Sequence, residues 1–229
     1  MNRSRRGGSG EAGERGPHGA HGGAGAAIRR RGIALVVSAP SGAGKTTLCR
    51  EVRSLLPDLS YSVSYTTRMP RPGEAEGKDF HFVSEAVFHA MRDRGEFAEW
   101  AVVHGNLYGT ATGPLEQGLA AGFDILLDID TQGARQLRAR YSEAVTIFVV
   151  APSLAELEQR LRERRSDPPQ EIARRLRRAR EEMATWREYD YLIVNRDLKD
   201  AVDQLATVIQ AERCRVSRLS VEFPDLGLS

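Results

Sequence analysis

Hydrophobic positions along the chain form short continuous runs separated by amphipathic stretches. The runs predict buried strands at 33–38, 123–129, 145–150 and 191–194, because a strand covered on both faces of a sheet has no polar side. The amphipathic stretches predict a first helix that runs from the glycine-rich turn after the strand 33–38 to about residue 56. Further helices are predicted over 114–121, 132–141, 154–164, 170–188 and 198–219. Strands that alternate with helices at both ends of the chain indicate an α/β fold, a parallel sheet flanked by helices.

The middle of the chain, 61–110, has a different pattern. Strands are expected at 61–67, 80–83 and 97–103, with one helix over 84–94 and a turn over 105–110. Such a strand-rich stretch with a single helix predicts an insert beside the main sheet. A second irregularity is the segment 165–169, which contains proline and interrupts the two helices on either side of it.

The net charge of +2 averages two unlike parts. Residues 1–31 hold seven arginines and two glutamates with almost no apolar content, so this segment is predicted to be a disordered tail. A nucleic-acid-binding arm and an inert tail are both compatible with its charge, and the lack of aromatic residues favours the inert tail. The remaining residues are mildly acidic, so any basic site there must be local. No nucleic-acid partner is expected.

Two further absences narrow the class of protein. Cys49 and Cys214 are too few for a disulfide framework or a cysteine metal cluster, which fits a reducing, cytoplasmic setting. No apolar run approaches the ~18 residues that a membrane span requires. No membrane association is expected.

Residues 39–47 (APSGAGKTT) carry the strongest local signal, a P-loop between a buried strand and a helix. Its glycines let backbone N–H groups face a polyphosphate, and the helix N-terminus adds its positive dipole end. Lys45 is one of only three lysines and is placed to bridge the β- and γ-phosphates, while Thr46 offers a hydroxyl to Mg²⁺. The motif predicts a P-loop NTPase-type sheet, but by itself it serves a GTPase, an ATPase or a small-molecule kinase equally well.

A second candidate anion site lies in the predicted insert. Arg68 and Arg71 flank Pro70 in the segment 66–74 (TTRMPRPGE). Proline keeps this segment extended, so the two guanidinium groups can converge on one external anion.

With these two motifs, 105–110 (GNLYGT) and 127–133 (LDIDTQG), the sequence resembles the guanylate kinase family over about residues 33–215. The resemblance implies transfer of a phosphoryl group from ATP to GMP or dGMP. It also implies a domain over 32–217, with a core of 32–60, 111–152 and 190–217, a GMP-binding region of 61–110 and a lid of about 153–189, followed by a C-terminal tail of 218–229. The small-molecule partners would be ATP and GMP, and the protein a monomer or weak homo-oligomer.

The resemblance assigns residues to the GMP site. Arg68, Arg71 and Tyr108 fall where the family holds the GMP phosphate, and Phe80 stands where tyrosine is usual. The residues expected to read guanine are Ser64, Glu99, Thr110 and Asp128. A carboxylate such as Glu99 accepts hydrogen bonds from both N1–H and the exocyclic amine of guanine, while hydroxyls of Ser64 and Thr110 can donate to O6.

The resemblance also assigns the ATP side. The expected ATP-binding residues are Ala39, Pro40, Ser41, Gly42, Ala43, Gly44, Lys45, Thr46, Thr47, Arg160, Arg164 and Asn195. Catalytic roles fall to Lys45, Arg68, Arg164 and Arg175, which neutralise the transferring group. Mg²⁺ is the expected cofactor, held by Thr46, Asp128 and Asp130, partly through water. An aspartate at the end of the buried strand can instead cap the next helix.

Three positions depart from the family pattern: Phe80, Arg165 in place of a lid glycine, and Arg196 after Asn195. Neighbouring lid arginines such as Arg174, Arg177 and Arg178 are expected to be exposed and paired with glutamates of the same helix. Two alternatives remain at this point. One is a non-catalytic protein-binding module, which would tend to lose the P-loop or the lid arginines. The other is a different P-loop kinase, for example one acting on a ribose phosphate.

Overall fold

Five parallel strands form the central sheet in the computed structural model, which describes residues 27–163 and 168–222. Their order is β10-β9-β2-β8-β3, so the P-loop strand β2 is in the middle. The strands are β2 (Ala34–Ser38), β3 (Ser60–Tyr61), β8 (Ile125–Asp128), β9 (Val145–Val150) and β10 (Tyr191–Val194). The predicted parallel α/β sheet is confirmed, and its central strand carries the phosphate loop at its carboxyl end.

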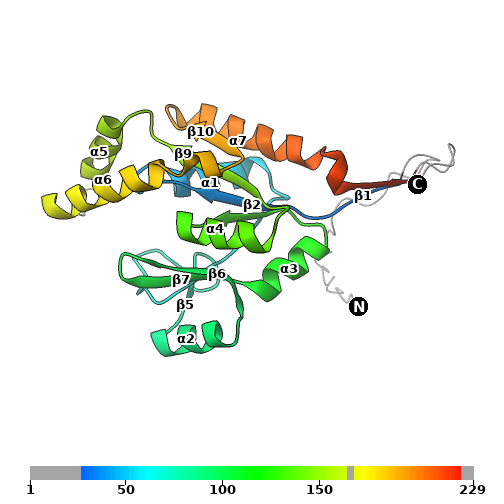
Figure 1. The fold of residues 1–229 in the computed structure, drawn as a ribbon, viewed down its shortest axis with the longest axis horizontal. Coiled ribbons are helices and arrows are strands. Elements are labelled where there is room, and N and C mark those ends of the chain that lie inside the picture. Colours follow the sequence, from blue (N-terminus) through cyan, green and yellow to red (C-terminus); the bar gives the residue numbers. More distant parts are fainter. Residues whose placement is uncertain (1–26, 164–167, 223–229) are drawn as a thin grey trace, which may run out of the picture.

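Helices cover both faces of this sheet, which explains the uninterrupted hydrophobic run of β2 (Figure 1). Leu35 and Val37 point to the side of α1 (Lys45–Leu55) and α7 (Leu198–Arg213). Val36 points to the opposite side, where α3 (Thr112–Ala120) and α4 (Thr131–Arg140) pack. All three side chains are fully buried, so successive residues are apolar because each faces a covered surface.

A second sheet forms the insert below the core in Figure 1. Its order is β5-β4-β7-β6, with β4 (Tyr65–Thr66), β5 (His81–Phe82), β6 (Phe97–Val103) and β7 (Asn106–Ala111). Helix α2 (Glu85–Asp93) packs on it through Phe88 and Met91 against Phe97. The prediction of a strand-rich insert is confirmed. The prediction of a turn over 105–110 is wrong, because 106–111 is strand β7 and the reversal is confined to the hairpin tip at His104 and Gly105.

The expected lid consists of two helices at the left of Figure 1, α5 (Leu154–Glu163) and α6 (Pro169–Met183). Residues 165–167 of the break predicted over 165–169 lie outside the described residues. Helix α6 ends five residues before the predicted end at 188, and a short 3₁₀ turn, Trp186–Glu188, follows. Likewise, α7 ends at Arg213 and a 3₁₀ turn at Val216–Arg218 replaces the end of the predicted helix 198–219.

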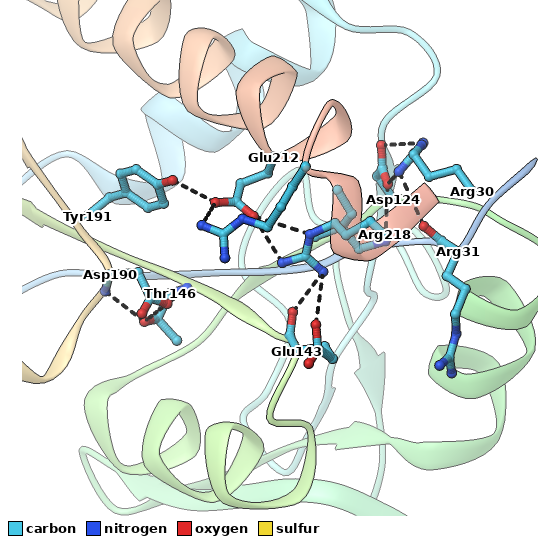
Figure 2. Close-up of polar contacts among 11 residues, drawn as sticks. Arg30, Arg31, Asp124, Glu143, Thr146, Asp190, Tyr191, Glu212 and Arg218 are labelled. Atoms are coloured by element: carbon cyan, nitrogen blue, oxygen red, sulfur yellow. Dashed lines mark hydrogen bonds and ion pairs between the residues drawn. The ribbon is translucent and has the colours of Figure 1, made fainter. Parts of the chain in front are cut away.

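The two ends of the described chain pair with each other. Strand β1 (Ala27–Arg30) runs antiparallel to β11 (Leu219–Glu222), so residues 27–30 of the tail expected over 1–31 and residues 219–222 of the tail expected over 218–229 are strands. The rest of the disorder predicted over 1–31 falls mostly on 1–26, which lie outside the described residues. Figure 2 shows two buried carboxylates that anchor this ribbon. Asp124 receives the Arg30 guanidinium at 2.9 Å, and Glu212 receives the Arg218 guanidinium at 2.9 Å. These charge-assisted bonds fix the ribbon to the core.

Candidate active site

The P-loop surrounds a cavity of about 210 Å³ at the N-terminus of α1. Every residue of the predicted loop except the buried Ala43 lines this cavity. Gly44 begins the helix at φ 93, a left-handed conformation that favours glycine, and it supplies no side-chain cap. The first N–H groups of α1 therefore remain available to an external anion, as the sequence predicts.

Asn195 holds the P-loop through a hydrogen bond to its backbone. Its side chain donates from Nδ2 to the carbonyl of Ala43 at 2.8 Å, and only 5% of the residue is exposed. A Cβ atom on Gly44 would lie 2.5 Å from the same Nδ2, so glycine is also required here for close packing. Arg160 in turn donates to the carbonyl of Asn195 at 3.0 Å. Neither side chain lines the loop cavity, so these two predicted ATP-binding residues hold the loop in this structure instead of facing its cavity.

Lys45 extends from the loop to the end of strand β8. Its ammonium group lies 2.7 Å from Asp128 Oδ1 and donates to the carbonyl of Ile129 at 2.6 Å. Burial alone would lower the pKa of Lys45, but the Asp128 carboxylate outweighs burial, and the pKa is raised above its usual value. Lys45 is therefore a charged ammonium at neutral pH.

The two aspartates expected to hold Mg²⁺, Asp128 and Asp130, already have partners in the protein. Asp130 caps α4, since its Oδ1 accepts from the Gly133 N–H at 2.9 Å, and Gln132 donates to its Oδ2 at 3.1 Å. Thr46 lines the loop cavity and also the larger cavity described below. Within 27–163 and 168–222, no three His, Cys, Asp or Glu side chains converge as a metal site. This arrangement fits a cation held mostly by substrate phosphates, with few protein ligands, which is usual for Mg²⁺.

Helix α6 places arginines over the P-loop. Arg175 donates to Ser41 Oγ from Nε at 3.1 Å and from Nη2 at 2.6 Å. Arg178 lies 3.6 Å from Asp130 Oδ2 and donates to Glu182 at 2.9 Å. The expectation that Arg178 is an exposed residue paired only within its helix is wrong, because it also faces Asp130 and lines the loop cavity. The predicted catalytic Arg164 lies outside the described residues.

A larger cavity of about 460 Å³ adjoins the loop cavity and shares Lys45, Thr46 and Asp130 with it. All predicted GMP-binding residues except Thr110 line it. Arg68 pairs with Glu74 through two bonds of 2.8 and 3.0 Å, and its Nε donates to Tyr108 Oη at 3.1 Å. The Glu74 bonds raise the pKa of Arg68. The guanidinium is thus held in a fixed orientation at the cavity wall.

Phe80 and Arg71 complete this end of the cavity. The Arg68 Cζ lies 5.2 Å from the centroid of the Phe80 ring, within cation–π range. Arg71 is exposed, and its backbone N–H donates to Glu74 at 2.7 Å. Glu74 therefore ties the two arginines together, one through its guanidinium and the other through its backbone.

Glu99 also lines the larger cavity and is 3% exposed. The hydroxyl of Thr110 donates to its Oε1 at 2.6 Å. Burial raises the pKa of Glu99 to about 7, although the Thr110 bond opposes the shift. The expected donation from Thr110 to a guanine O6 is not the contact seen, because this hydroxyl is directed at Glu99. Ser64 lines the same cavity.

Four residues that line the loop cavity escaped the sequence prediction. They are Val103, His104, Arg178 and Glu182. Arg178 and Glu182 follow Arg175 at helical spacings of three and seven, so the assignment of Arg175 contained a signal for both. His104 lies at the tip of the β6–β7 hairpin and has a positive φ of 50. Its pKa is lowered mainly by burial and also by the positive charge of the nearby Arg178. No sequence signal placed this hairpin beside the loop.

Comparisons with known proteins agree with this geometry. The guanylate kinase family model matches residues 31–212. A guanylate kinase of Geobacter sulfurreducens is 54% identical over 192 residues, which covers 84% of this chain and 95% of that protein. One of Gluconobacter oxydans is 50% identical over 190 residues, covering 82% and 91%. A crystal structure of guanylate kinase from Anaplasma phagocytophilum superimposes with a TM-score of 0.72 at 34% identity, covering 84% and 92%. The family match spans all the residues that line the two cavities, and the chain belongs to the guanylate kinase family.

Proposed function

We propose that this chain transfers the γ-phosphoryl group of ATP to GMP or dGMP, giving ADP and GDP, in the two adjoining cavities. The observation that carries the proposal is that the P-loop cavity and the arginine-lined cavity meet at Lys45, Thr46 and Asp130. Two nucleotides bound on either side would bring donor and acceptor phosphates together there. Holding both reactants in line is the main requirement of phosphoryl transfer, which needs no covalent protein intermediate.

The donor phosphates would be held by the loop N–H groups and by Lys45. Because the Lys45 ammonium is already charged and held by Asp128, it can move to the β- and γ-phosphates without a change of protonation. Arg175, 2.6 Å from Ser41 of the loop, would neutralise charge on the transferring group. Arg164 is proposed for the same role from its place in the sequence. Arg160 and Asn195 would act by holding the loop.

The acceptor phosphate would bind Arg68, Arg71 and Tyr108. Glu74 and Tyr108 fix the Arg68 guanidinium at the cavity wall, and the Tyr108 hydroxyl, which accepts from Nε, keeps its own proton to donate to the phosphate. Arg71 is exposed and can turn toward the anion. A phosphate that contacts both arginines would gain charge-assisted, oriented hydrogen bonds. Phe80 supplies packing to this pocket but no hydroxyl.

The guanine base would be read at the Glu99 side. An ionised Glu99 accepts from N1–H and the exocyclic amine, and Thr110 orients the carboxylate. Adenine presents an acceptor at N1, so it would leave the carboxylate facing a lone pair. Ser64 and Asp128 line the same cavity and would contribute further polar contacts.

Mg²⁺ would enter with ATP, with Thr46 as a protein contact and with Asp128 and Asp130 nearby to hold its water molecules. When bound, it supplies positive charge to the phosphates. Lys45 and Arg178 now neutralise the two aspartates, and both would be drawn toward the phosphates. Removal of Mg²⁺ is expected to abolish turnover.

The division into mobile parts is also proposed. The core would comprise 32–60, 111–152 and 190–217, the GMP-binding region 61–110 and the lid about 153–189.

No helix within the described part of the chain is long and apolar enough to cross a membrane. Cys49 and Cys214 are free thiols, which supports a reducing, cytoplasmic setting. A monomer or weak homo-oligomer is proposed, and sedimentation at several concentrations tests it.

The proposed function is tested by a coupled ADP-release assay with ATP and Mg²⁺. Acceptors are GMP, dGMP, AMP, UMP and none. We expect turnover with GMP and dGMP only. Turnover only with a non-guanine acceptor would contradict the proposal in favour of another P-loop kinase. Absence of turnover with every acceptor, together with retained nucleotide binding, would favour a binding module.

A further inference from the structure

The guanine-side carboxylate Glu99 belongs to strand β6, which is the outer strand of the insert sheet. The register of β6 against β7 shifts between Phe97 and Glu99, so Ala98 is an extra residue in the ladder. Such a bulge locally disrupts pairing and re-aims a side chain. It also explains why Phe97, Ala98 and Glu99 are all buried in succession. A bulge at a sheet edge leaves the position of Glu99 weakly fixed by the sheet alone.

Helix α4 supplies the missing partner to this edge. The side chain of Gln136 accepts from the Trp100 N–H at 3.2 Å and donates to the Trp100 carbonyl at 2.7 Å. One amide thus satisfies both backbone groups of the residue next to Glu99, as a neighbouring strand would. Arg140, one turn further along α4, donates to the Phe97 carbonyl at 3.2 Å. The bulge is therefore held on both sides by α4.

The first turn of α4 lies against the carboxyl group itself. A Cβ atom on Gly133 would lie 2.9 Å from Cδ of Glu99, so the carboxylate rests where any other residue would place a side chain. Gly133 and Gln136 are three residues apart and share one face of the helix. Asp130, the N-cap residue of the same helix, lines both cavities.

We propose that Gln136 and Gly133 are positioning residues for guanine discrimination, which hold the bulged strand so that the Glu99 carboxylate meets the base. This inference rests on the proposed guanine-reading role of Glu99. Gln136 touches no substrate in this scheme and acts through the Trp100 backbone. It also ties the insert to helix α4, whose N-cap residue Asp130 lines both cavities. The guanine site and the phosphate-binding groups would therefore keep a fixed separation.

The test compares GMP with inosine monophosphate, which keeps N1–H but lacks the exocyclic amine. Gln136→Met keeps the length and helix propensity of an exposed side chain and removes both hydrogen bonds. We expect the ratio of kcat/KM for GMP to that for inosine monophosphate to fall about tenfold, through a higher KM for GMP, with the KM for ATP unchanged. Gln117→Met, at an exposed glutamine of α3, is the matched control and should leave the ratio unchanged.

A double-mutant cycle separates this inference from the role of Glu99 itself. Glu99→Gln should lower the ratio by roughly 100-fold, and adding Gln136→Met should then have little further effect. Gly133→Ala is a second, independent variant and should also lower the ratio. An unchanged ratio in Gln136→Met overturns the positioning role while Glu99 keeps its own. The positioning role is also overturned if Gln136→Met lowers the ratio as much in the Glu99→Gln protein as it does in the natural protein. An unchanged ratio in Glu99→Gln refutes both the Glu99 assignment and the inference.

Discussion

The ammonium group of Lys45, a residue that lines both cavities, lies 2.7 Å from Oδ1 of Asp128, which lines the larger one. The P-loop lysine is thus paired with the carboxylate that ends strand β8. In the proposed reaction two polyanions would meet beside Lys45, so this ion pair would have to open for Lys45 to reach them. The Asp128 carboxylate keeps the lysine charged in the meantime, which is the form that the phosphates require.

Lys45→Ala is expected to lower kcat by about 10²–10³, because it removes a positive charge aimed at the transferring group. The fold should persist, since the lysine contributes one ion pair at the cavity wall. Steady-state kinetics and a thermal melt measure the two effects. Lys199→Ala is the control, because Lys199 is exposed and pairs with Asp203 of its own helix. Retention of full turnover in Lys45→Ala would refute the assigned role.

The pKa of Glu99, raised to about 7 by burial, predicts a pH dependence of GMP binding. Below about pH 7 the carboxyl group is protonated and cannot accept two hydrogen bonds from guanine, so the KM for GMP should rise as pH falls. Glu99→Gln should bind GMP more weakly than the natural protein above about pH 7, where Glu99 is ionised, and should lose this pH-dependent component. The titration of the GMP phosphate is common to both proteins, so the difference between their profiles isolates Glu99. Identical profiles would contradict the prediction.

The same pKa shift predicts a cost in stability. Folding raises the pKa of Glu99 from 4.5 to about 7, so the folded state binds this proton more tightly than the unfolded chain. That contribution to stability is complete below pH 4.5 and is lost as pH rises through about 7. Relative to Glu99→Gln, the unfolding free energy of the natural protein should fall by up to about 3 kcal/mol between pH 4.5 and 8. Urea unfolding of both proteins measures it, and a constant difference across this range would count against the shift.

Arg178→Ala is expected to raise the KM for ATP and lower kcat, together by about tenfold, because Arg178 brings a guanidinium into the loop cavity. It also leaves the half-buried Glu182 without the guanidinium that donates to it at 2.9 Å. Arg177→Ala is the matched control, since Arg177 is the adjacent, exposed arginine of α6. Equal effects of the two substitutions would show that only the overall charge of the lid matters.

Phe80→Tyr is expected to lower the KM for GMP several-fold, because a hydroxyl at the ring edge can donate to the phosphate held by Arg68. The ring already lines the cavity, with its centroid 5.2 Å from the Arg68 Cζ. The KM for ATP should not change. A KM for GMP that stays constant or rises would show that the added hydroxyl does not reach the anion.

Short local patterns were sufficient for much of the fold. The run over 33–38 and the glycine-rich turn after it predicted β2, the loop and α1, because each depends on neighbours in sequence. Residues 105–110 were misjudged for the opposite reason. Glycine and asparagine there favour a turn locally, but pairing with both β4 and β6 makes the segment a strand. The contact partners of a strand are distant in sequence, and periodicity cannot show them.

The site divides in the same way. The sequence by itself determined the phosphate loop, the arginine pair of the insert and the membership of both in one enzyme family, since these depend on residue types at fixed spacing. Only the tertiary structure decided that Asn195 supports the loop, that Thr110 orients Glu99, that Arg178 reaches Asp130 and that Gln136 holds the edge of β6. Each of these is a contact between different elements. Its existence depends on how helices and strands pack, and packing is decided by the whole core at once.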